Sequence, residues 1–186
     1  MRRLLIISMS FIILALIFTG CEEAGESGSS ITQSEAEAGI EEVGATIEKA
    51  MNSVEANPQP EGITVEMDSS TATYIFDNVS YDDSTIDGTI EMTIGGTQDS
   101  SEASMSFDNL TVDSITVDGS LDIKGTVIDE TTSETEITGT ITITGGSISS
   151  LSYDIKVTNE TVTGTITVNG KSFDADVFSE DNLPAM

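Results

Sequence analysis

The segment IDGTIEM, residues 86–92, alternates apolar and polar residues around one glycine, and three later segments repeat its pattern. These are VDGSLDI at 117–123, ITGTITI at 137–143 and VTGTITV at 162–168. Alternation with a period of two indicates a β-strand with one buried and one solvated face. The chain from 62 to 178, rich in Thr, Ser, Ile, Val and Asp, is therefore predicted to be a mainly β domain.

The repeat extends beyond the seven-residue segment. Residues 76–92 align without a gap to residues 107–123, and each copy begins with Phe-Asp-Asn. The four segments are unevenly spaced, which favours an antiparallel meander grown by hairpin duplication over a regular solenoid.

The strand glycines fall on the predicted buried face, where they contribute no side chain to the core. A turn centred on Asp82 places Phe76 opposite Gly88, and the corresponding turn in the second repeat places Phe107 opposite Gly119. Three further pairings follow from predicted turns at 145–147, 158–159 and 169–170: Tyr153 with Gly139, Tyr153 with Gly164, and Ile166 with Phe173.

We interpret this pattern as aromatic rings that lie over the missing glycine side chains and let the strands bend. The expected fold is a curved antiparallel meander of about nine strands, a half-barrel or barrel. Two flat, stacked sheets would contradict it.

An amphipathic helix is predicted over residues 34–57, ahead of the β domain. Ser34 and Glu37 match a capping box at its start, and Pro58 follows its end. Its apolar residues recur every three or four positions and predict packing on the concave side of the sheet, with a partner-binding helix as the alternative. They are Ile40, Val43, Ile47, Met51 and Val54.

Residues 1–20 have the organisation of an export signal: Arg2 and Arg3, an apolar run from 4 to 18, and small residues before Cys21. The Thr-Gly-Cys ending resembles the lipobox of bacterial lipoproteins. The resemblance covers only this leader, and it implies cleavage before Cys21, a diacylglyceryl thioether on that cysteine and acylation of the new amino terminus. It implies an exported protein of the bacterial cell envelope, anchored in the outer or cytoplasmic membrane. An ordinary cleaved signal and an uncleaved anchor are the alternatives.

Two further segments complete the predicted organisation. Residues 21–33 form an acidic tether, whose part from 22 to 30 reaches at most roughly 30 Å when extended. Residues 179–186 form a C-terminal tail.

The formal net charge of the chain is −27, and removal of the leader, with two arginines and no acids, makes it −29. This charge argues against binding to nucleic acid or to anionic lipid head groups. Solvation, adaptation to high salt and divalent cation binding are three interpretations of the acidity.

Residues typical of many active sites are absent, since the sequence has no histidine and its only cysteine is Cys21. Ser-His-Asp and Cys-His catalysis are thereby excluded, no phosphate-binding glycine loop is present, and we predict no enzymatic activity. Calcium is the one cofactor worth considering, although aspartate is also a common turn former. Its possible ligands near predicted turns are Asp82, Asp83, Asp99, Asp129, Glu130, Asp174 and Asp176.

Two functions from different classes remain. The first is a structural or interaction domain displayed on the envelope, with a protein or glycan partner. The second is a binding module that carries an apolar ligand or lipid between helix and sheet. The residues expected to form either a packed core or an apolar pocket are Phe76, Met92, Met105, Phe107, Tyr153 and Met51. Edge strands near Ile63 and Phe178 could pair between copies, and the surface acidity opposes this.

Overall fold

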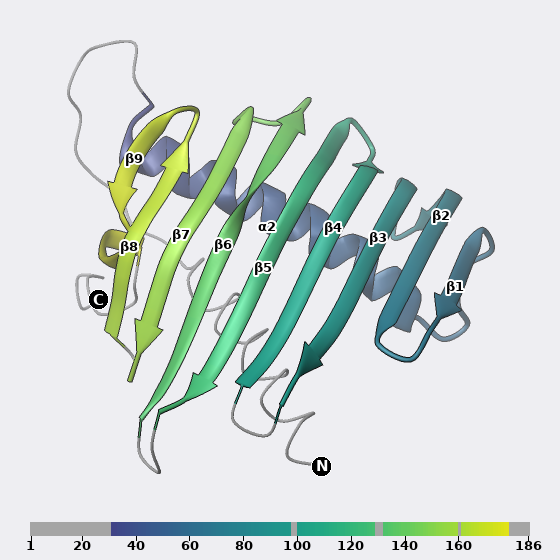
Figure 1. Ribbon diagram of the computed structural model, residues 1–186. Coiled ribbons are helices and arrows are strands. Elements are labelled where there is room, and N and C mark those ends of the chain that lie inside the picture. Colours follow the sequence, from purple (N-terminus) through teal and green to yellow (C-terminus); the bar gives the residue numbers. More distant parts are fainter. Residues whose placement is uncertain (1–30, 98–99, 129–131, 160, 179–186) are drawn as a thin grey trace.

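The computed structural model describes residues 31–97, 100–128, 132–159 and 161–178. Nine antiparallel strands form one sheet in sequence order, and the sheet curls without closing, with helix α2 crossing behind it (Figure 1). The predicted open curved meander is therefore confirmed, and the closed barrel is excluded. The strands are β1 (Ile63–Met67), β2 (Thr71–Tyr81), β3 (Ser84–Gly96), β4 (Ser100–Val112), β5 (Ile115–Val127), β6 (Ser133–Thr144), β7 (Ser150–Thr158), β8 (Thr161–Val168) and β9 (Lys171–Asp174).

Helix α2 (Gln33–Glu55) begins earlier than the predicted capping box at Ser34 and Glu37. The N-cap is Thr32: its Oγ1 accepts from the Glu35 N–H at 3.2 Å, and the Glu35 carboxylate accepts from the Thr32 N–H at 2.8 Å. The bond from the Thr32 N–H, and a second one from the Thr32 hydroxyl to the same carboxylate, lower the pKa of Glu35. The sequence carries two overlapping capping-box patterns, Thr32/Glu35 and Ser34/Glu37, and the earlier one is used.

The buried face of α2 is also shifted from the predicted stripe. Ile40 and Val43 are buried as expected, whereas Ile47, Met51 and Val54 are only partly buried at its side. Small residues complete the fully buried line and let the helix approach the sheet closely: Ala36, Gly39, Thr46, Ala50 and Ser53.

The aromatic–glycine pairings are confirmed in three cases: Phe76 opposes Gly88, Phe107 opposes Gly119, and Tyr153 opposes Gly139. The Asn169-Gly170 turn, with positive φ at both residues, pairs Ile166 with Phe173 as predicted. The pairing of Tyr153 with Gly164 is wrong. Thr158 opposes Thr161, and in this register Gly164 opposes Ile155 and Tyr153 opposes Ile166.

Each Phe-Asp-Asn repeat forms a β-bulge that the period-two pattern did not reveal. Asp77 and Asn78 together oppose the single residue Asp87, and Asn78 has a φ of 50°. The Asn78 N–H donates to the Asp87 carboxylate at 3.2 Å. The second repeat has the same geometry, with φ 50° at Asn109 and a bond of 2.7 Å from its N–H to Asp118. A bulge increases the local twist and bend of a strand, so the repeated motif helps to curl the sheet.

The two edges of the sheet are unequal. Beyond the four-residue strand β9, the short 3₁₀ helix η1 (Ala175–Phe178) turns back onto β8, and its Ala175 and Phe178 are buried. The Phe173 and Phe178 rings meet edge to face, 5.8 Å apart. At the other side of the sheet, β1 pairs only with β2. Phe178 is therefore buried by this return, whereas β1 near Ile63 has no second strand partner among the described elements.

Candidate interaction surfaces

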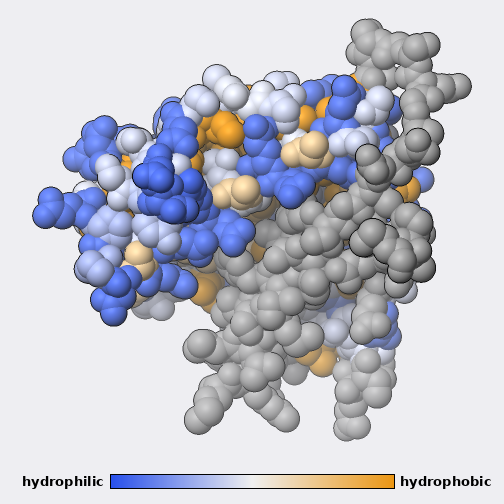
Figure 2. Space-filling view, turned by 180° about the vertical axis from the view of Figure 1, so that it is seen from behind, coloured by the Kyte–Doolittle hydropathy of each residue, from blue (hydrophilic) through white to orange (hydrophobic). Residues whose placement is uncertain are grey.

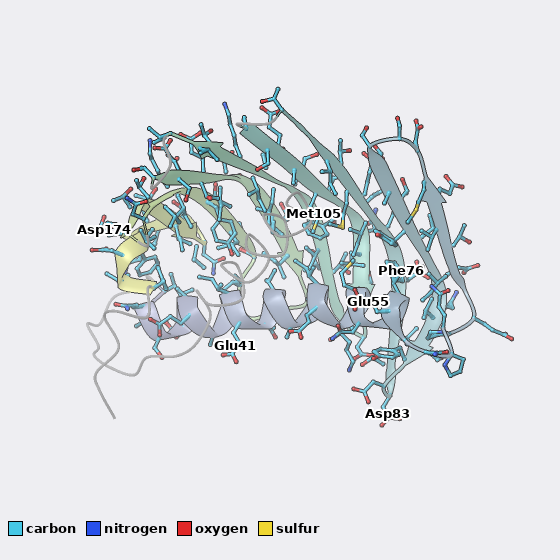
Figure 3. All side chains as sticks on the ribbon, turned by 90° about the horizontal axis from the view of Figure 1, so that it is seen from below. Glu41, Glu55, Phe76, Asp83, Met105 and Asp174 are labelled. Atoms are coloured by element: carbon cyan, nitrogen blue, oxygen red, sulfur yellow. The ribbon has the colours of Figure 1, made fainter. Side chains whose placement is uncertain are left out.

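The six residues predicted to form a core or pocket all belong to the layer between sheet and helix. Phe76, Met105, Phe107 and Tyr153 are buried, and Met51 and Met92 pack half-buried against them. Seen from below, the sheet arches over α2, and Glu41 lies on the opposite side of the helix (Figure 3). Met92 opposes Met105, which opposes Leu121, so part of this set lies in one row across neighbouring strands.

Tyr153 is the one phenol in the buried core. Burial raises the pKa of its hydroxyl, and within the described part of the chain that hydroxyl has no hydrogen-bond partner. No side-chain oxygen or nitrogen in the described residues is both fully buried and unpaired. Tyr153 as a whole is 5% exposed.

The helix is fixed to the sheet at both halves of its length. Near its start, Gly39 lies directly against Ile148 of the β6–β7 loop, and the Glu42 carboxylate accepts from both the N–H and the hydroxyl of Ser147 at 2.7 Å. These contacts join segments more than a hundred residues apart. Sequence reasoning missed them, because no local pattern marks which helix residue meets which loop.

The second attachment runs through Lys49. Its ammonium donates to the Ser84 hydroxyl at 2.6 Å, and that hydroxyl donates to the Asp113 carboxylate at 2.7 Å. The Thr85 N–H donates to the same carboxylate at 3.0 Å. Both bonds to the carboxylate lower the pKa of Asp113, and the backbone bond from Thr85 contributes more than the bond from Ser84. With attachments in both halves of its length, α2 is a built-in part of the core.

The outer, convex face carries hydroxyl and charged side chains in register. One line of residues, which we call the hydroxyl row, crosses six neighbouring strands: Ser106, Ser120, Thr140, Ser152, Thr167 and Ser172. Two of its neighbouring pairs are hydrogen-bonded, at 3.0 Å between Thr140 and Ser152 and at 2.9 Å between Thr167 and Ser172. Because adjacent strands lie about 4.8 Å apart, the row forms a regular ladder of hydroxyl groups.

Charged rows lie beside the hydroxyl row. Asp122, Asp154 and Asp174 alternate with Thr138 and Thr165 in the next row across the strands. The row beyond alternates acids with lysines, and Lys156 contacts Glu134 at 2.7 Å, which raises the pKa of Lys156. Lys156 also lies 3.9 Å from the Glu136 carboxylate, so its charge is balanced by acids on this face, and the hydroxyl row lies next to carboxylates.

A second surface is apolar. Five large apolar side chains are exposed, and we call them the apolar rim: Val65, Met67, Ile94, Val127 and Ile128. Val65, Met67, Ile94 and Val127 have the register of the inner face but lie where no described element covers them. From the side opposite to Figure 1, the surface of the described residues that are visible is mainly hydrophilic, with small orange patches among the blue residues (Figure 2).

Among the described residues, the possible calcium ligands do not gather. Asp82 and Asp83 form the β2–β3 turn with φ values of 47° and 59°, whereas Asp99, Asp129 and Glu130 lie outside the described residues. Within the described ranges, no three His, Cys, Asp or Glu side chains are placed to hold a metal ion.

Cys21, the leader, most of the tether and the tail at 179–186 also lie outside the described residues. Among the residues that are described, no helix is long and apolar enough to cross a membrane. Comparison with known proteins finds no family model, no curated protein and no solved structure that matches this chain.

Proposed function

We propose that this chain is a lipid-anchored protein of the bacterial cell envelope, a non-enzymatic display domain whose convex face meets a protein or glycan partner. The observation that carries this proposal is the hydroxyl row, a solvated ladder of Ser and Thr in register over six strands and flanked by carboxylates. Hydroxyl groups both donate and accept hydrogen bonds, so such a ladder suits a polar partner.

The way in which α2 is held supports a rigid presenting scaffold. Its attachments through Gly39, Glu42 and Lys49 tie it to loops at separate parts of the sheet. Phe76, Met105 and Phe107 are buried in one continuous core with it. A domain that displays a fixed surface needs this rigidity, whereas a carrier must open.

The anchor and the charge fit the same role. Two or more acyl chains at Cys21 hold a protein stably on a membrane, and the acidic domain is repelled by anionic head groups. The tether then allows the convex face to stand away from the bilayer.

Site-specific photo-cross-linking in intact cells tests this proposal. A photoreactive residue in place of Thr140, on the hydroxyl row, is expected to yield a discrete adduct with one partner. The matched control replaces Glu41, which is exposed on the far side of α2. A Cys21→Ser variant is expected to lose both its membrane association and the adduct. No adduct at Thr140, or equal adducts at both positions, would contradict a partner on the convex face.

The carrier function is the second candidate, and two observations favour it. The apolar rim continues the inner face, and the buried Tyr153 hydroxyl has no hydrogen-bond partner within the described part of the chain. Native mass spectrometry of the mature protein, released gently from its membrane, tests it. An apolar mass that leaves on denaturation would replace the display proposal with the carrier. A protein mass without ligand is the result we expect.

A further inference from the structure

The free edge of β1 carries unpaired backbone groups. The Asp77 N–H donates to the Gly62 carbonyl and the Asp68 N–H to the Thr71 carbonyl, so residues 62 and 68 face β2. Backbone groups of an antiparallel strand alternate in direction. Thr64 and Glu66 therefore also bond to β2, whereas the N–H and C=O groups of Ile63, Val65 and Met67 point outward.

The side chains of the same three residues lie on the inner face, and they become more exposed toward the end of the strand. Ile63 is partly buried, Val65 is 38% exposed and Met67 is 76% exposed. An exposed strand edge with apolar side chains is a template for strand addition. The opposite edge strand, β9, has only four residues and carries no exposed large apolar side chain, so β1 is the edge of the described sheet with an exposed apolar face.

Two copies of β1, with the sequence Ile-Thr-Val-Glu-Met, can pair antiparallel with matching side chains on both faces. With Val65 on a two-fold axis, each Ile63 meets Met67 of the second copy, and the two Val65 residues meet each other. The backbone N–H and C=O groups of all three residues point away from β2, so this register forms about six backbone hydrogen bonds between the copies. On the outer face each Glu66 lies opposite a Thr64, and no two acids are directly opposed.

We propose that two copies of this protein pair through β1, in this register, to form one continuous sheet. A five-residue strand buries less than the roughly 800 Å² per partner of a standard interface, and two net charges near −29 repel each other. The dimer is therefore weak in free solution. Anchoring through Cys21 confines the copies to one surface and raises their effective concentration. That enhancement rests on the proposed lipid anchor, whereas the pairing itself does not depend on the convex face.

Cysteine cross-linking of the mature lipoprotein in liposomes tests the pairing. Cys21 is consumed by its lipid, so Val65→Cys introduces a single thiol next to the two-fold axis. Val127→Cys is the matched control, because Val127 is also an exposed inner-face valine (48%) but lies on the interior strand β5. With a short bifunctional thiol reagent, we expect at least about tenfold more dimer from Val65→Cys.

Two further substitutions, each combined with Val65→Cys, test whether backbone pairing along β1 forms the dimer. Met67→Pro removes an outward N–H without breaking a bond to β2 and is expected to abolish the dimer, whereas Met67→Leu retains it. Raising the salt from about 0.1 M to about 1 M shortens the Debye length from about 10 Å to about 3 Å and should increase the dimer yield.

Equal cross-linking from positions 65 and 127 would overturn the proposal, as would a dimer that survives Met67→Pro or the absence of any dimer. A heterologous adduct when native membranes replace liposomes, without the homodimer, would assign the edge to a different partner. Failure of this pairing leaves the Thr140 adduct unaffected, so the two proposals are tested separately.

Discussion

Gly119→Ala is expected to lower the free energy of unfolding by roughly 3 kcal/mol or more. Gly119 has a φ of 120°, a conformation that residues with a side chain rarely adopt. A Cβ at this position would also collide with the Thr140 carbonyl oxygen on β6. That oxygen belongs to the backbone of an interior strand, so it cannot move aside without disturbing the sheet. Urea denaturation of wild type and variant measures the loss.

Gly95→Ala is the matched control for this prediction. Gly95 also lies in a long strand of the sheet, β3, but its φ is not in the positive region and a Cβ there would meet no atom within 4 Å. This variant is expected to be neutral or more stable by up to about 1 kcal/mol, because alanine restricts the unfolded chain. Equal destabilisation by the two changes would show that the strand glycines are not needed for the curl.

Gly39→Leu is expected to destabilise the protein by about 2 kcal/mol or more through overpacking. The Cβ alone would overlap the branched side chain of Ile148, which is 3% exposed and held by the surrounding core. In an isolated helix the change from glycine would instead favour folding by up to about 1 kcal/mol. The sign of the effect therefore separates helix propensity from docking.

A double-mutant cycle with Ile148→Ala checks the contact. Each single change is expected to destabilise, and the double variant should be more stable than additivity predicts by about 1 kcal/mol or more. Ala38→Leu, on the exposed side of the same helical turn, should change stability by less than about 0.5 kcal/mol. Simple additivity of the cycle would argue against direct packing of Gly39 on Ile148.

The hairpin between β2 and β3 shows how much of the strand register the sequence pattern predicted. The pairing of Phe76 with Gly88 was predicted from a turn centred on Asp82, and it is present. The actual turn is the two residues Asp82 and Asp83, which shifts the register by one, and the bulge at Asn78 shifts it back. The prediction was right because the two errors cancel. At β7 and β8 no bulge compensates, and the predicted pairing of Tyr153 with Gly164 is wrong.

The candidate surfaces were predicted to different degrees. Alternation identified the inner residues, including Phe76 and Met105, and it placed Thr and Asp on the outer face. It could not show that Phe178 would be buried while Val65 and Met67 stayed exposed. The burial of Phe178 depends on η1 turning back onto β8, and that return is not encoded in the strand pattern.

The sequence by itself determined the strands, their order, the antiparallel pairing and an N-terminal amphipathic helix. Each of these depends on local physics: the period of two, the turn residues between neighbouring strands, and capping within a few residues. Only the tertiary structure decided which face of α2 is buried, where Gly39 meets Ile148, and which edge strand keeps exposed apolar side chains. Those features come from packing between segments far apart in the chain, where shape and the lack of a Cβ decide the contact, and no single segment carries that information.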